Sequence, residues 1–196
     1  MKLILTRHGE TEENRKLIMQ GQSDGKLSAD GISQAKKLAL RLKDEKIDCI
    51  YSSDLSRAAD TAKEIAVYHP DVPFEVVAEL RECSLGVMEG KTKKEMGFSD
   101  GERPPKELRD TCEGFDVLFS RAENFLHKVL SKHADDVVLF VAHSIINRAL
   151  IAVITGKGHE DVPFVERVGN ASVSVFEIDE DKNHKIHLFN CVGHLE

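Results

Sequence analysis

Four side chains suited to phosphate chemistry follow short apolar runs of the sequence. They are Arg7, His8, Arg57 and His143. Arginine suits phosphate because its planar guanidinium donates two parallel hydrogen bonds, and a neutral imidazole can attack phosphorus to form a phosphohistidine. A helix predicted to begin near Ser144 would offer its N-terminal N–H groups to the same anion. The set therefore indicates binding and transfer of a phosphoryl group.

Glu82 adds an acid to this set. Transfer of a phosphoryl group to His8 would leave an alkoxide that needs a proton. A carboxyl group packed among phosphate oxygens would hold such a proton, and afterwards could accept one from the attacking water. Charge on the transferring group would be neutralised by Arg7, Arg57 and His143. We therefore expect neither a metal ion nor a cofactor.

Each residue taken alone also has a structural interpretation. Arg57 could pair along its helix with Asp54 or Asp60. His143 could be a hydrogen-bonded core histidine, and Glu82 an ordinary surface carboxylate. What favours chemistry is their convergence on one predicted edge of a sheet.

Alternating strands and helices are expected to bring these residues together. The predicted elements are a strand at 1–6, a helix at 30–46, a strand at 48–52, a helix at 54–68, a strand at 74–77, a helix at 113–132, a strand at 137–142, a helix at 145–154, and hairpin strands at 171–178 and 185–190. This order is typical of an α/β fold with a mostly parallel sheet and helices on both faces. Such folds bind ligands at the carboxyl ends of their strands. The hairpin should turn through 179–183.

The length agrees with one such domain. The chain has 196 residues, within the range of a single domain, and we assign all of 1–196 to it. The stretch 86–109 is rich in glycine and charge and lacks apolar periodicity, so we expect it to be a loop region that covers the active site.

Charge and apolar patterning exclude other classes of protein. The net charge of −7 has the opposite sign to that of a general binder of nucleic acids or anionic membranes. No apolar run is long and uninterrupted enough to span a bilayer, and no signal peptide is recognisable. The four cysteines form no CxxC pair, which is typical of reduced thiols. We expect a cytoplasmic protein, monomer or homodimer, whose partner is a small phosphorylated metabolite.

The segments around these residues resemble the signature of the histidine phosphatase superfamily, in its phosphoglycerate mutase-like branch. The matching blocks are LTRHGET at 5–11 followed by Asn14, QG at 20–21, YSSDLSRA at 51–58, LRE at 80–82 and VAH at 141–143. They occur in the family's order, which makes the resemblance much more specific than an isolated Arg-His-Gly.

The resemblance implies a three-layer α/β/α sandwich and a role for each matched residue. His8 would be the phosphorylated nucleophile and Glu82 the proton donor. The phosphate pocket would be completed by Arg7, Arg57 and His143, and Asn14, Gln20 and Gly21 would contact the phosphate or the other end of the substrate. Two positions depart from the pattern: Ser144 stands where the family usually has glycine, and Met88 where it often has an aromatic residue. Ser144 should still offer its N–H group, and its hydroxyl would add a substrate contact.

Hydrolysis and mutase chemistry are both open to this family. Its mutases resemble one another in a longer, basic insertion after the third block, whereas 91–109 is short and balanced in charge here. We therefore predict a metal-independent phosphatase that acts through a phosphohistidine. The alternative is phosphoryl transfer of the cofactor-dependent phosphoglycerate mutase type. The complete catalytic set argues against an inactive scaffold protein. Sugar phosphates, phosphoglycerate, fructose bisphosphate and a cobalamin-pathway phosphate are all open as substrates.

Overall fold

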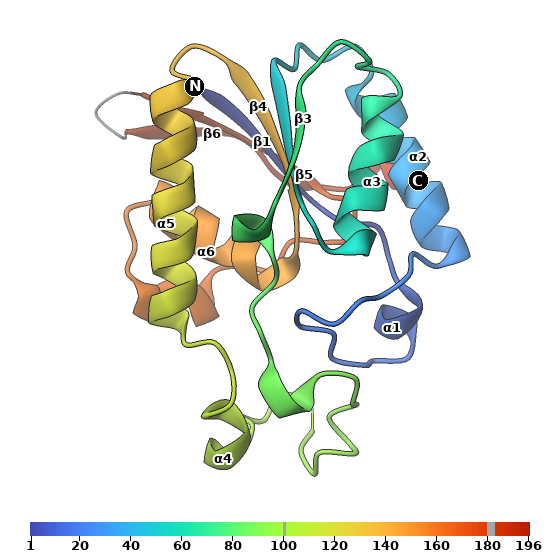
Figure 1. Cartoon of the computed structure of the whole chain (residues 1–196), viewed down its shortest axis with the longest axis vertical. Helices are drawn as coiled ribbons and strands as arrows, with labels where there is room; N and C mark the ends of the chain where they lie inside the picture. Colours follow the sequence, from blue (N-terminus) through green and yellow to red (C-terminus); the bar gives the residue numbers. More distant parts are fainter. Residues whose placement is uncertain (100, 180–182) are drawn as a thin grey trace.

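A six-stranded sheet lies between two layers of helices in the computed structural model, which describes residues 1–99, 101–179 and 183–196 (Figure 1). The strands are β1 (Lys2–Arg7), β2 (Cys49–Ser53), β3 (Phe74–Val77), β4 (Val137–Ala142), β5 (Val173–Ile178) and β6 (His184–Cys191). Their order in the sheet is β3-β2-β4-β1-β5-β6. The first four are parallel to one another, and β5 and β6 form the predicted antiparallel hairpin.

The register of the parallel strands sets the place of the predicted site. Arg7, the last residue of β1, lies opposite Ala142, the last residue of β4. His8 and His143 therefore leave the sheet side by side at the carboxyl edge. Because β2 runs parallel to β4 on its other side, the loop that leads to Arg57 emerges at that edge too.

The helices cover both faces of the sheet, as predicted. They are α1 (Glu12–Arg15), α2 (Ala29–Leu42), α3 (Ser56–Ala66), α4 (Lys106–Arg109), α5 (Phe115–Lys132) and α6 (Ser144–Ile154), with the short turns η1 (Ala78–Leu80), η2 (Gly86–Met88), η3 (His159–Phe164) and η4 (Gly193–Leu195). Figure 1 shows α2 and α3 on one side and α5 and α6 on the other. Successive residues of a strand point to opposite faces, so Leu139 of β4 packs with α2 and α3 and Phe140 with α5 and α6.

Several element boundaries differ from those predicted. Helix α2 starts at the Ser28 cap, whose hydroxyl accepts a hydrogen bond from Gly31 N, but it ends at Leu42 rather than at residue 46. The His69 ring donates to the carbonyl of Leu42 and thereby satisfies one of the last carbonyls of the helix. Neither α1 nor α4 was predicted, because a helix of four residues is too short to show an apolar period.

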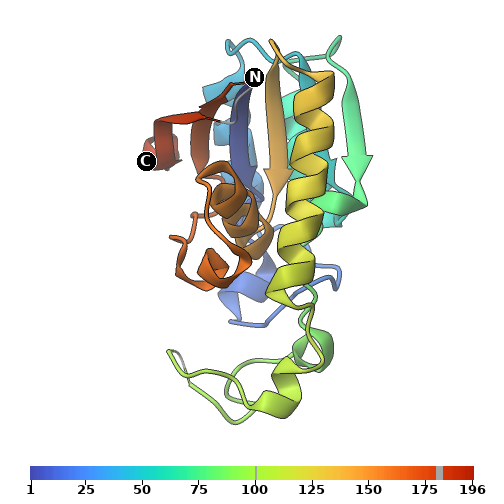
Figure 2. The same ribbon diagram turned by 90° about the vertical axis from the view of Figure 1, so that its left-hand side faces the viewer.

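The segment between η1 and α5 extends beyond the carboxyl edge of the sheet, where Figure 2 shows it as a separate lobe of loops and short helices. It contains the stretch 86–109 that we expect to cover the active site, of which residue 100 lies outside the described residues. The predicted turn at 179–183 lies partly outside them as well. None of the helices in the described part of the chain combines the length and apolar character that crossing a bilayer requires.

Candidate active site

His8 lies at the end of β1 with only 3% of its surface exposed. Its ring Nδ1 is 2.7 Å from the carbonyl oxygen of Gly9. Since a carbonyl oxygen can only accept, Nδ1 carries the proton and Nε2 keeps its lone pair. Burial, together with the positive charges of Arg7 and Arg57, holds the pKa of His8 well below its usual value. His8 is therefore a neutral imidazole with a free nucleophilic nitrogen.

His143 has the opposite tautomer. It follows β4, is completely buried, and its ring centroid lies 5.1 Å from that of His8. Arg57 Nε donates to His143 Nδ1 at 3.2 Å, which places the ring proton on Nε2. That buried nitrogen has no hydrogen-bond partner among the described residues. Burial and the charge of Arg57 lower the pKa of His143 well below its usual value. The ring is thus a neutral donor beside His8.

Arg57 lies in the first turn of α3 and is 1% exposed. Besides His143, its guanidinium binds the carbonyl oxygens of Ser23 at 2.9 Å and Gly21 at 2.7 Å. The alternative pairing along the helix is wrong. Asp54 pairs instead with Arg81, and Asp60 with Lys63. Arg57 therefore connects the loop at 20–23 to the histidine pair.

Arg7 completes the cationic side of the site. Its Nη1 donates to the carbonyl oxygen of Val168 at 3.0 Å, whereas its buried Nε has no partner within the described parts of the chain. Burial lowers the pKa of Arg7, and the nearby carboxylate of Glu82 opposes that shift. Buried polar groups are normally hydrogen-bonded. The unused donors of Arg7 and His143 therefore suit an anionic ligand beside His8.

Glu82 is 7% exposed and is held by the start of α6. Its Oε1 accepts hydrogen bonds from the N–H groups of Cys83, Ile145 and Ile146 at 2.9, 2.9 and 3.0 Å. Its Oε2 shares the N–H of Ile145 at 3.0 Å. Two of the N–H groups at the start of α6, those of Ile145 and Ile146, are thus used by the carboxylate. The start of this helix therefore positions Glu82.

The predicted substrate contacts lie around this centre with different roles. Asn14 Oδ1 accepts from Asn170 Nδ2 at 3.4 Å, and the same amide donates to the carbonyl oxygen of His8 at 3.0 Å. Gly21 contributes its carbonyl to Arg57. Gln20 is buried, and its Oε1 has no donor among the described residues. Ser144 is the half-buried first residue of α6.

Sequence reasoning missed the residues that support the centre. The Thr61 hydroxyl accepts from Gly9 N at 3.1 Å and donates to the Arg57 carbonyl, so it holds the His8 loop against α3. The sequence could have indicated Thr61 by its position four residues after Arg57, because such residues share a helix face. Arg121 was missed too, although a charged residue three positions after the buried Leu118 is unusual on the apolar face of a helix.

In the described part of the chain, no group of three His, Cys, Asp or Glu side chains could hold a metal ion.

Comparison with known proteins decides the family. The model of the histidine phosphatase superfamily (branch 1) matches residues 3–191. The chain belongs to this superfamily. Phosphoglycerate mutase-like protein 4 of Arabidopsis thaliana is 31% identical over 100% of this chain and 87% of its own length. The metal-independent phosphoserine phosphatase of the same plant is 33% identical over 99% of this chain and 83% of its own.

Solved structures of this superfamily have the same fold. YhfR of Bacillus stearothermophilus has a TM-score of 0.88 and 28% identity, with 100% of this chain and 99% of that chain covered. The predictions of a phosphoglycerate mutase-like α/β fold and of a phosphatase of the histidine type are confirmed.

Proposed function

We propose that this histidine phosphatase hydrolyses small phosphate monoesters that carry a second anionic group, with His8 Nε2 as the nucleophile. The observation that carries the proposal is the hydrogen bond from His8 Nδ1 to the Gly9 carbonyl. It leaves the Nε2 lone pair free in a ring that stays neutral at physiological pH. Attack forms the Nε2–P bond as the bond from phosphorus to the ester oxygen breaks.

The buried donors around His8 would stabilise the transferring group. The Nε2–H of His143 and the Nε–H of Arg7 are buried donors that have no hydrogen-bond partner among the described residues. Fixed donors of this kind are effective because they need no reorganisation as negative charge develops on the equatorial oxygens. Arg57 acts beside them by fixing the tautomer of His143 and contributing its positive charge.

Glu82 would handle the proton in both half-reactions. Oε1 already accepts three N–H groups, whereas Oε2 shares only one. We therefore assign the transferable proton to Oε2. It passes to the leaving alkoxide when the phosphohistidine forms. In the second half-reaction water attacks phosphorus, the P–Nε2 bond breaks, and Oε2 takes a proton from that water. Inorganic phosphate and a restored His8 result.

A basic cavity next to Asn14 supports an anionic substrate. A cavity of about 770 Å³ is bounded by Asn14 on one side and by the segment after η2 on the other, and Lys16, Lys94 and Arg167 contribute basic side chains to it. These charges suit a substrate carboxylate. The name of the phosphoserine phosphatase relative makes phosphoserine the first candidate to test.

A cytoplasmic location is part of the same proposal, because all four cysteines are free thiols, as is typical of proteins in reducing compartments.

The test is a phosphate-release screen combined with trapping of the intermediate. Wild-type protein should release phosphate from phosphoserine or a related anionic monoester without added bisphosphoglycerate. Rapid acid-free quenching with ³²P-labelled substrate should show acid-labile phosphate on His8. His8→Ala should lower turnover by about a thousandfold or more. Full activity of His8→Ala would overturn the assignment of the nucleophile, and strict dependence on bisphosphoglycerate would favour the mutase alternative.

A further inference from the structure

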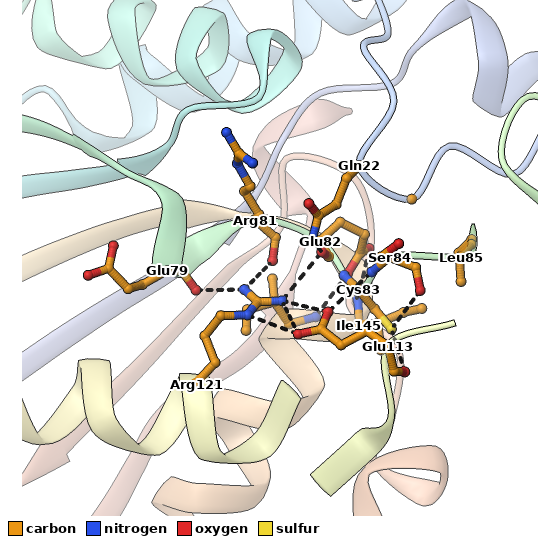
Figure 3. A network of polar contacts seen from close by, with 12 residues as sticks. Gln22, Glu79, Arg81, Glu82, Cys83, Ser84, Leu85, Glu113, Arg121 and Ile145 are labelled. Carbon is orange, nitrogen blue, oxygen red and sulfur yellow. Dashed lines mark hydrogen bonds and ion pairs between the residues drawn. The ribbon is translucent and has the colours of Figure 1, made fainter. Parts of the chain in front are cut away.

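An ion pair that contacts Glu82 only through its backbone carbonyl holds the chain on both sides of this residue. Arg121, on α5, points its guanidinium at the chain that leads into Glu82 (Figure 3). Its Nη1 donates to the carbonyl oxygens of Glu79 and Arg81, each at 2.8 Å, and its Nη2 reaches the carbonyl of Glu82 at 3.4 Å. Three carbonyls within four residues are thus bound by one side chain.

Glu113 completes this arrangement from the chain just before α5. Its carboxylate accepts from Arg121 Nε at 3.1 Å and from Nη2 at 2.8 Å, in a bidentate pair. The same carboxylate accepts from Ser84 N at 3.2 Å, and Glu113 N donates to the Ser84 carbonyl at 2.9 Å. Arg121 therefore holds the residues before Glu82, and Glu113 holds the residues after it.

The pair of Arg121 and Glu113 is shielded from water, so its charges interact more strongly than those of an exposed pair. The side chains of Arg121 and Glu113 are only 19% and 12% exposed. A shielded charged pair holds its partners firmly, and removal of one member leaves the other without compensation. The pair of Asp54 with Arg81, on the other side of Glu82, is more open, with exposures of 28% and 41%.

We propose that Arg121, paired with Glu113, is a positioning residue for the proton transfer by Glu82. The pair fixes the backbone from Glu79 to Ser84, so that the carboxylate meets the N–H groups at the start of α6 and keeps Oε2 toward the ester oxygen. This inference rests on the proposed role of Glu82. A displacement of the order of 1 Å at a catalytic group can cost about a hundredfold in rate.

The experiment separates proton donation from the other steps by the choice of leaving group. A serine alkoxide needs a proton to leave, whereas p-nitrophenolate leaves without one. The value of kcat/KM covers the reaction only up to formation of the phosphohistidine, so it excludes the later attack of water. Arg121→Lys and Glu113→Gln should lower kcat/KM for phosphoserine by about tenfold to a hundredfold and for p-nitrophenyl phosphate by less than about threefold.

Glu82→Gln provides the reference for this pattern. This variant should also lose more kcat/KM for phosphoserine than for p-nitrophenyl phosphate, and its loss for phosphoserine should be larger, about a hundredfold or more. In the Glu82→Gln background, Arg121→Lys should then cost little further, because coupled residues are not additive. An equal loss on both substrates, or full additivity in the double variant, would overturn the positioning role. If Glu82→Gln itself lacked the selectivity, the proposed role of Glu82 would fail instead.

Tyr51→Phe is the matched control for destabilisation. The Tyr51 hydroxyl binds His133 Nε2 at 3.0 Å and accepts a hydrogen bond from Lys132 Nζ at 3.1 Å. Lys132 is the last residue of α5, the helix that carries Arg121. Loss of the Tyr51 hydroxyl should lower the midpoint of thermal unfolding and leave the ratio of the two kcat/KM values unchanged. A changed ratio in Tyr51→Phe would mean that mere instability produces the effect, and would also overturn the inference.

Discussion

At the scale of single residues, one hydrogen bond to each ring sets the chemical state of the two histidines. The carbonyl of Gly9 places the His8 proton on Nδ1, and the guanidinium of Arg57 places the His143 proton on Nε2. One ring consequently presents a lone pair and the other a donor. Two histidines of the same type thus have complementary functions because their neighbours differ.

Replacement of Arg57 by lysine should disturb this state. Lysine has no planar fork, so it cannot keep the bonds to Ser23, Gly21 and His143 at once. Each lost bond from a charged donor costs about 1.5–3 kcal/mol, and we expect kcat/KM to fall by about a hundredfold. Steady-state kinetics measure the loss. Arg41→Lys is the control and should leave kcat/KM unchanged, because Arg41 of α2 forms an exposed pair with Glu45. A normal rate for Arg57→Lys would contradict the role of the planar guanidinium.

At the scale of elements, close packing of a loop on a helix start places His8. The first turn of α2 lies directly against the loop after β1, and a methyl group added at Gly31 would overlap the carbonyl oxygen of Glu10. The Ser28 hydroxyl, which caps the helix, donates to Glu10 Oε1 at 2.8 Å. The loop that carries His8 is therefore supported by the start of α2.

Gly31→Ala should therefore affect both stability and activity. The methyl group must push away backbone rather than a flexible side chain, and overpacking of this kind costs about 1–3 kcal/mol. Urea unfolding should show that loss, and kcat should fall because the loop that carries His8 moves. Gly193→Ala is the matched control, since nothing lies within 4 Å of the added methyl. Equal behaviour of the two variants would rule out a special role for the contact at Gly31.

At the scale of the whole molecule, the two edges of the sheet have different tasks. The carboxyl edge collects the buried cations and the histidine pair. The opposite edge holds a structural cluster in which His133 bridges the Tyr51 hydroxyl and the carboxylate of Asp136. Strand β4 and helix α5 connect the two edges. Stability and catalysis can therefore be changed separately, as the Tyr51→Phe control assumes.

Acid should destabilise the free enzyme through its histidine pair. In the folded protein the pKa of His8 and of His143 lies well below the ordinary value of 6.5. Below pH 6.5 the unfolded chain therefore binds protons that the folded chain does not. As the pH is lowered below 6.5, the free energy of unfolding should therefore decrease, by up to about 1.4 kcal/mol per pH unit for each ring.

Urea unfolding at pH 7.5, 6.5 and 5.5 measures this dependence. The wild-type slope below pH 6.5 should exceed that of His143→Gln, which has one fewer buried ring. Other titrating groups are shared by the two proteins and cancel in the difference. Identical slopes would mean that His143 takes up protons in the folded state as readily as in the unfolded chain.

The sequence alone predicted the strands, the four main helices and the convergence of Arg7, His8, Arg57, Glu82 and His143 at one edge of the sheet. Apolar periodicity is a local property, so β3 and β4 were predicted with their observed bounds, and the short α1 and α4 were not. Parallel strands present their carboxyl ends at one edge, so residues as distant as His8 and His143 could be placed together from their positions behind strands.

Only the tertiary structure decided how these residues are held. The tautomers of the two rings depend on a carbonyl and a guanidinium that come within reach only after folding. The start of α6 binds the carboxylate of Glu82, and Arg121 and Glu113 bind the backbone on either side of Glu82. Contacts between distant segments depend on register and packing, and no periodicity in the chain encodes them.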